Sequence, residues 1–135
     1  MRINKYRGRR NYDEKWIYGS LLIDRNGDFH ILESNIIEKD GHHIRIDSDY
    51  PMFFDNDTIG QFTGLCDKNG IEIYTDDKVI IEKEDDEEIF VVKWDDNTAR
   101  FIMDSETYVL DFDNYDGTDC EVIGNIHERS ENNDK

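Results

Sequence analysis

Apolar residues along the chain fall into short segments that alternate with polar residues or form brief continuous runs. No stretch of ten or more residues repeats with the 3.6-residue period of an amphipathic helix. Polar breaks separate the segments, and most of them are Asn or Asp followed by Gly, a pair that suits tight hairpin turns. Such turns are expected at Asn26-Gly27, Asp40-Gly41, Asn69-Gly70 and Asp116-Gly117. The pattern predicts a mainly β protein.

The N-terminal part has the weaker strand pattern. Strands are expected at 15–24, 29–32 and 43–46, whereas 55–64 is ambiguous and fits a short helical turn followed by a strand. The sequence therefore predicts a small β-rich part over residues 1–57.

The C-terminal part has the sharper pattern. The segment 89–94 (IFVVKW) is apolar on nearly both faces, which indicates a central strand. Further strands are expected at 78–83, 99–103, 108–112 and 120–126. Five short strands joined by tight turns within about 50 residues are typical of a small barrel. We therefore expect an SH3-like β barrel at 58–128 and a disordered polar tail at 129–135.

Charge narrows the range of partners. The 135 residues include 16 Lys and Arg against 33 Asp and Glu, for a net charge of −17. Backbone phosphates are bound by clustered Lys and Arg, so direct nucleic-acid binding is not expected. The first ten residues are the exception, because they are basic and contain no acid. We expect Arg7, Arg9 and Arg10 to form a charge arm that pairs with the protein's own acidic surface or with a neighbouring subunit, and a nucleic-acid arm is the alternative.

The sequence contains no P-loop, Gly-x-Gly-x-x-Gly or Gly-x-Ser-x-Gly motif, and no Cys-x-x-Cys or His-x-x-x-His spacing. Residues 111–117 are similar to a calcium loop but miss its spacing in both registers. Cys120 is expected to pack inside, and Cys66, which precedes a tight turn, to be the more exposed thiol; a nucleophilic role beside a histidine is the alternative. We therefore expect no enzymatic activity, no cofactor and no metal site.

Membrane and export signals are not visible either. The uncharged stretches are far shorter than the ~20 apolar residues of a transmembrane helix. No apolar segment of a signal peptide follows the basic N-terminus. We expect a cytoplasmic protein that is not attached to a membrane.

Two segments carry a resemblance to a known family: QFTGLCDKNGIEIYTDDKV at 61–79 and EVIGNIHE at 121–128. The first resembles the central motif of the YopX family of phage and prophage proteins, and the second resembles that family's C-terminal signature. The resemblance extends over nearly the whole chain. It implies an SH3-like barrel behind a β-rich N-terminal part and a phage or prophage origin. It implies no reaction, so there are no catalytic residues to carry over.

The motif residues also have a physical interpretation. Asx side chains cap turns and Gly accepts positive φ, so a structural role is expected for Gly64, Asp67, Asn69, Gly70, Asp77, Gly124 and Asn125. The functional alternative is a binding groove lined by Phe62, Tyr74 and Trp94, because SH3-like barrels often bind through exposed aromatic side chains.

Two functions are consistent with these features. The first is a non-enzymatic protein-binding or assembly module, which we expect to form a homo-oligomer. The alternative is an acidic DNA mimic, a decoy whose carboxylates occupy the DNA-binding cleft of a host protein. A metal-dependent hydrolase would instead require several acids to converge on one bound ion.

Overall fold

The computed structural model describes residues 4–32, 37–40, 43–46, 54–83, 86–107, 109–113, 115 and 117–128. It divides the chain into two compact units, Met1–Gln61 and Phe62–Lys135, whereas the sequence placed the boundary after residue 57. All regular structure among the described residues is β-strand, apart from the three-residue 3₁₀ turn Gly117–Asp119. The predicted mainly β class is therefore confirmed. The predicted tail at 129–135 lies outside the described residues.

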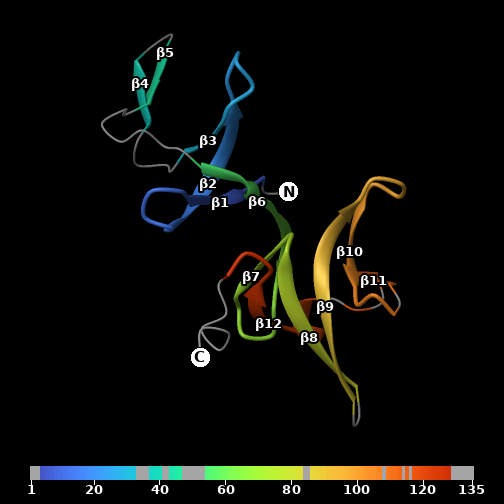
Figure 1. The fold of residues 1–135 in the computed structure, drawn as a ribbon. Coiled ribbons are helices and arrows are strands. Elements are labelled where there is room, and N and C mark those ends of the chain that lie inside the picture. Colours follow the sequence, from blue (N-terminus) through green and yellow to red (C-terminus); the bar gives the residue numbers. More distant parts are fainter. Residues whose placement is uncertain are drawn as a thin grey trace. The chain divides into compact units, whose positions relative to one another are not determined.

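Unit 1 is built on one antiparallel sheet and a separate hairpin (Figure 1). Its strands are β1 (Tyr6–Arg10), β2 (Trp16–Ile23), β3 (Phe29–Leu32), β4 (Ile37–Asp40), β5 (His43–Ile46) and β6 (Phe54–Cys66), which continues into unit 2. In the sheet, β1 lies between β2 and β6, and β3 lies beyond β2. The hairpin pairs β4 with β5.

The core of unit 1 is small. Ile17, Ile31 and Phe54 are its buried apolar residues among those described. Strand β1 crosses them at Gly8, where a Cβ atom would lie 2.9 Å from Ile31 Cδ1 and 3.1 Å from Phe54 Cδ1. Glycine at this position therefore lets the backbone of β1 lie directly on the core.

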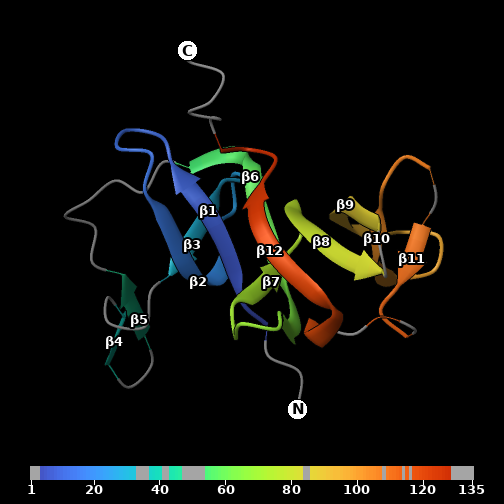
Figure 2. The same cartoon turned by 90° about the horizontal axis from the view of Figure 1, so that it is seen from below.

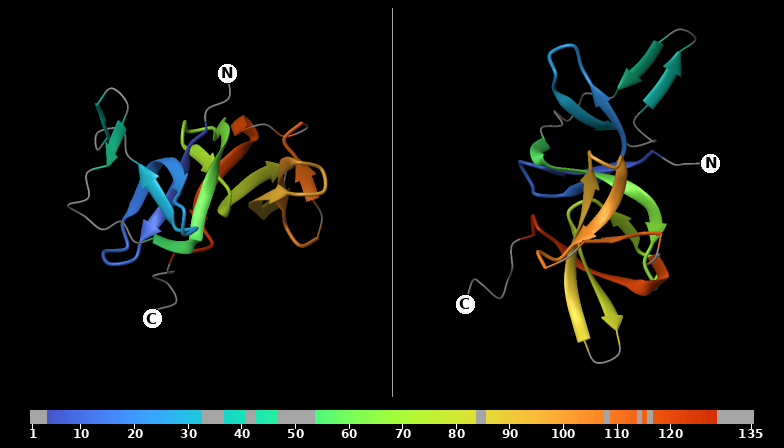
Figure 3. Two further views of the ribbon diagram at one scale, coloured as in Figure 1. Left: turned by 90° about the horizontal axis from the view of Figure 1, so that it is seen from above. Right: turned by 90° about the vertical axis from the view of Figure 1, so that its right-hand side faces the viewer.

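Unit 2 contains the end of β6 and a five-stranded antiparallel sheet (Figure 2). Its strands are β7 (Glu72–Tyr74), β8 (Asp77–Lys83), β9 (Asp86–Asp95), β10 (Arg100–Asp104), β11 (Val109–Asp111) and β12 (Cys120–Asn125). The order in the sheet is β11-β10-β9-β8-β12, and β7 pairs with the end of β6. Strands β8 and β9 form the long hairpin drawn in yellow in Figure 3.

One face of this sheet forms the core of unit 2. Alternate residues of the strands point to this side, as strand geometry requires. The register pairs Val79 with Phe90 and Val92 with Met103, and all four are at most 1% exposed. The buried set is completed by Ile73, Ile81 and Cys120.

Neither sheet closes into a barrel in the described part of the chain. Among the residues that the structure describes, β12 pairs only with β8, and β7 pairs only with β6. Two contacts from the turn after β6 reach β12: Lys68 N–H donates to Cys120 O at 3.0 Å, and Val122 N–H donates to Asp67 Oδ2 at 2.9 Å. The SH3-like barrel predicted from the sequence is therefore not confirmed, because a turn and a side chain occupy the edge at which a closed barrel has strand pairing.

Candidate functional site

The second face of the unit 2 sheet carries apolar side chains where a solvated face normally carries polar ones. Four of them lie on three adjacent strands: Ile80 on β8, Ile89 and Val91 on β9, and Ile102 on β10. Ile80 lies directly opposite Ile89. Ile89 is 52% exposed, and the other three are half-buried. We call these four residues the outer patch.

Charges of both signs border the outer patch. Val91 has Lys78 opposite it on β8 and Asp104 opposite it on β10. Lys93 lies two residues further along β9, and its Nζ donates to Asp104 Oδ2 at 2.9 Å. Two further acids face the same side, since Glu121 on β12 lies opposite Ile80 and Asp111 on β11 lies opposite Ile102. Residues 62–135 as a whole hold 7 Lys and Arg against 22 Asp and Glu.

This patch is not among the sites expected from the sequence. Its signal was the pair of continuous apolar runs at 79–81 and 89–92, which place apolar side chains on both faces of two strands. The prediction that 89–94 is a central strand is confirmed, since β9 lies between β8 and β10. The order of the strands must be known before one can tell that this second apolar face lies at the surface.

The three aromatic residues predicted to line a groove are not all at the surface. Phe62 and Tyr74 are 6% and 2% exposed, and their ring centroids lie 5.5 Å apart. Trp94 is 42% exposed and packs edge-on against Phe101, with 5.0 Å between centroids. The groove hypothesis is corrected for Phe62 and Tyr74, because both side chains are used in internal packing.

The three arginines of the predicted charge arm lie in β1, an inner strand of the unit 1 sheet. Arg7 is 6% exposed, and its guanidinium lies 4.9 Å above the ring of Trp16. Arg10 forms an ion pair with Asp13, and this contact lowers the pKa of that carboxyl to about 2. These arginines are thus bound within their own unit and do not form an extended arm.

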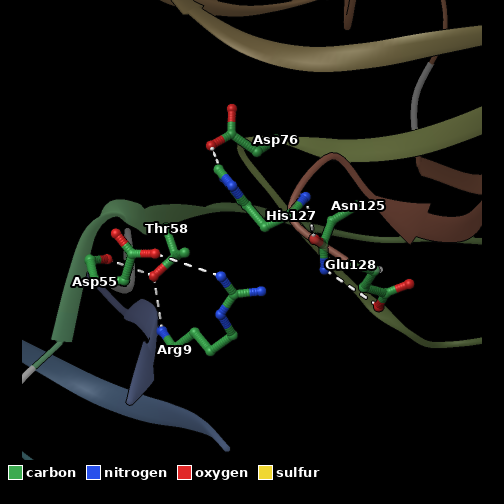
Figure 4. Close-up of polar contacts among 7 residues, drawn as sticks. All are labelled: Arg9, Asp55, Thr58, Asp76, Asn125, His127 and Glu128. Carbon is green, nitrogen blue, oxygen red and sulfur yellow. Dashed lines mark hydrogen bonds and ion pairs between the residues drawn. The ribbon is translucent and has the colours of Figure 1, made fainter. Parts of the chain in front are cut away.

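Arg9 occupies an irregular position in the same strand (Figure 4). Its backbone N–H donates to Thr58 Oγ1 at 2.9 Å, and its guanidinium lies 3.4 Å from Asp55 Oδ2. Thr58 Oγ1 in turn donates to the Asp55 carbonyl at 2.6 Å. The side chain of Thr58 therefore supplies a hydrogen bond where the pairing of β1 and β6 shifts register.

Asp67 accepts hydrogen bonds from three backbone N–H groups. It is 4% exposed; Oδ1 accepts the N–H groups of Asn69 (2.8 Å) and Ile71 (2.9 Å), and Oδ2 accepts that of Val122 (2.9 Å). Burial raises the pKa of this carboxyl, but the three backbone donors outweigh burial and hold the pKa below its ordinary value of 3.8. Gly70 N–H donates to the Asp67 carbonyl at 3.0 Å, which completes the turn.

The other motif residues lie in turns and at strand ends. Gly64 has φ of +91°, in β6 where the pairing with β7 is irregular. Asp77 is 1% exposed and accepts the N–H of Tyr74 at 2.7 Å, across the turn between β7 and β8. Gly124, with φ of +150°, follows the bulge in β12. Each contact fixes local backbone geometry.

A polar cluster holds the end of β12 (Figure 4). His127 Nε2 lies 2.8 Å from Asp76 Oδ2, and the His127 N–H donates to Asn125 Oδ1 at 2.8 Å. Asn125 Nδ2 also donates to Glu128 Oε1 at 3.2 Å. The ring of His127 is largely buried, with 15% of its side chain exposed. A His–Asp pair can serve acid–base chemistry, but the contacts of this pair attach the chain after β12 to the turn before β8.

The two cysteines differ as expected. Cys66 is exposed, and Cys120 is buried with its Sγ 3.7 Å from Met103 Sδ. Within the part of the chain that the structure describes, no three His, Cys, Asp or Glu side chains gather closely enough to hold a metal ion. The same part contains no helix long and apolar enough to span a membrane.

These features define a small β module with two units, one of which presents an apolar sheet face. The chain belongs to the YopX family: the profile of that family, described as YopX protein, matches residues 5–132. No curated protein matches the sequence. Among solved structures, the crystal structure of protein EF1440 from Enterococcus faecalis is similar, with a TM-score of 0.58 and 23% identity over 95% of this chain and 96% of that one. At this identity the likeness concerns the fold.

Proposed function

We propose that this protein is a non-enzymatic protein-binding module whose binding surface is the outer patch of unit 2. The main support for this proposal is a group of four β-branched apolar residues on three adjacent strands. One of them, Ile89, has half of its surface exposed. Contiguous apolar surface of this kind marks interaction sites in soluble proteins. Fully burying an Ile or Val side chain contributes about 1.5–3 kcal/mol, so the patch offers a substantial part of what specific association requires.

The proposal includes the finer expectations that the family resemblance supports. Unit 2 is an open variant of an SH3-like barrel. The free edge of β12 is not paired with another described strand, and hydrogen bonds with Asp67 and Lys68 hold it instead. The protein is encoded by a phage or prophage and acts in the cytoplasm of the host.

Site-specific photo-crosslinking tests the function. A photo-reactive amino acid replaces Ile89, which is 52% exposed, or Ile71, which is 50% exposed and lies outside the patch. We expect a discrete crosslinked product from position 89 and none from position 71 when the full chain is expressed in cells. The product should disappear when Val91→Lys is added to the position 89 chain. No product at position 89, or equal products at both positions, would overturn the proposal.

A second function is favoured by the distribution of charge. Residues 1–61 carry a net charge of −2, whereas residues 62–135 carry −15. A unit this acidic could act as a decoy for a DNA-binding protein, since its carboxylates would meet a basic cleft. That function predicts a complex that salt and competing DNA both dissociate and that Ile89→Lys leaves intact. A complex that Ile89→Lys abolishes would exclude the decoy in favour of the apolar patch.

A further inference from the structure

We infer that the occupant of the outer patch is a second copy of this chain, packed face to face about a two-fold axis that runs along β9. The inference rests on the proposed function and names its partner. The observation that carries it is a row of three paired residues across the sheet: Lys78 on β8, Val91 on β9 and Asp104 on β10.

This row is self-complementary under two-fold symmetry. When two sheets pack face to face about an axis along β9, β8 of one copy lies over β10 of the other. Lys78 of each copy then meets Asp104 of the second copy, and the contact occurs twice. Val91 lies on the axis and meets its own equivalent. Such an interface needs opposite charges at equal distances on the two sides of its axis. Lys78 and Asp104 provide them, one on each side of Val91.

The apolar residues fit the same axis. Ile89 and Val91 are both on β9, so each packs against its equivalent in the second copy. Ile80 and Ile102 lie on the strands at either side, but Ile80 is level with Ile89 and Ile102 is level with Lys93, so this axis does not place the two opposite each other.

Local charge favours a second copy over a basic partner. Lys78 and Lys93 are both exposed, and they are two of only five Lys and Arg residues in 62–128. A strongly basic protein would meet these two lysines at the outer patch, where they lie beside the apolar residues. A second copy brings Asp104 to Lys78 and leaves the pair between Lys93 and Asp104 in place.

Like charges on the axis strand set the salt dependence. Lys93 and the exposed Glu87, both on β9, approach their own equivalents, and each chain carries a net charge of −17. Salt screens these repulsions and also the two attractions between Lys78 and Asp104, while burial of the patch is insensitive to screening. With a net charge of −17 on each chain, the repulsion is the larger of the two effects. The dimer should therefore become tighter as ionic strength rises.

A charge-swap experiment tests the inference. Light scattering during size exclusion should give twice the 16.0 kDa chain mass for the wild-type chain. Lys78→Glu places two acids at each contact, and Asp104→Lys places two cations there, so each variant alone should associate at least about tenfold more weakly. Mixing the two variants in equal amounts restores both contacts and should restore the dimer. Lys68→Glu makes the same charge change in the turn after β6 and should leave the mass unchanged.

Asp104 also pairs with Lys93 and accepts the Glu106 N–H at 3.0 Å, so thermal unfolding must show that Asp104→Lys is folded. If that variant does not fold, two measurements still test the dimer. One compares the mass of Lys78→Glu with that of Lys68→Glu, and the other follows the mass of the wild-type chain as the salt concentration rises. A wild-type chain that is monomeric up to roughly 1 mM overturns the inference, as does a mixture of folded variants that stays monomeric. A monomeric chain that crosslinks a foreign protein through position 89 overturns only the dimer. A chain with no crosslink at position 89 overturns the proposed function as well.

Discussion

Replacing Asp67 with Asn should destabilise unit 2 by removing one charged acceptor. The Asn side chain can keep one carbonyl oxygen for the Asn69 and Ile71 N–H groups, but its NH₂ group then faces the Val122 N–H. A hydrogen bond to a charged group contributes about 1.5–3 kcal/mol, and a buried N–H left without an acceptor costs about 1–3 kcal/mol. We expect the free energy of unfolding to fall by about 2–4 kcal/mol, since the two effects overlap.

The dependence on pH distinguishes loss of charge from loss of shape. The pKa of Asp67 is lower in the folded state than its ordinary value of 3.8, so its stabilisation is fully present above pH 3.8 and is lost as pH falls through the folded pKa. The difference in stability between the wild-type chain and Asp67→Asn should therefore be constant above about pH 5 and should shrink below pH 3.8.

Hydrogen exchange at the Val122 amide is the most direct assay. A loss of 2–4 kcal/mol corresponds to exchange that is roughly 30- to 1000-fold faster where exchange requires unfolding of the unit. Urea unfolding followed by Trp94 fluorescence in a Trp16→Phe background should report the same loss. Asp95→Asn is the control, because Asp95 caps an exposed turn through Asn97 and Thr98 and should have a small effect. Equal effects of the two substitutions, or a difference that persists unchanged below pH 3, would refute the reasoning.

Three further substitutions test the backbone geometry of unit 2. In Gly117→Ala the new Cβ would overlap the carbonyl oxygen of Cys66, so we expect about 1–3 kcal/mol of destabilisation by urea unfolding. Gly64→Ala meets open space but keeps φ of +91°, so the loss should be nearer 1 kcal/mol, and a loss larger than that of Gly117→Ala would contradict this ranking. His127→Ala removes the contact with Asp76 and should speed hydrogen exchange at the end of β12 while β8 and β9 stay protected; uniform acceleration would exclude a local role.

The strands of unit 2 could be predicted because their chemistry is local. β8 and β10 each contain a short run of apolar residues between polar ones, and the turn from Asp67 to Gly70 contains the Asx and Gly residues that a tight turn requires. Each of these features depends on neighbours within a few residues. The interpretation of 89–94 as a central strand was of the same kind, since continuous apolar runs are typical of strands in the interior of a sheet.

Strand β6 could not be predicted with the same clarity. It runs from Phe54 to Cys66 and contributes to both units, and two of its four buried residues, Thr58 and Gly60, are not large apolar residues. Two glycines and several polar residues within it weaken the alternation. Its pairing depends on β1 and β7, and the former is separated from it by more than 40 residues of sequence.

The candidate site was obscured for a related reason. Tyr74 and Trp94 are both aromatic residues near strand ends, and only the packing of the sheet separates a 2% exposed ring from a 42% exposed one. The arginines of β1 look like a basic arm in the sequence, because the residues that bind them, such as Asp55 and Trp16, are brought beside them by strand pairing. Charge counted along the chain therefore said little about charge available at the surface.

The acidity of unit 2 and its apolar sheet face act together in the proposed assembly. An exposed apolar face invites non-specific association, and a net charge of −15 on residues 62–135 opposes it, because two such units repel each other in most orientations. Repulsion is reduced where lysines offset the acids, and Lys78 and Lys93 do so beside Val91 at the outer patch. The general charge thus suppresses wrong contacts, and the two lysines make this contact less unfavourable. This division of roles explains why a chain with 33 acidic residues keeps two of its few lysines beside an isoleucine and valine surface.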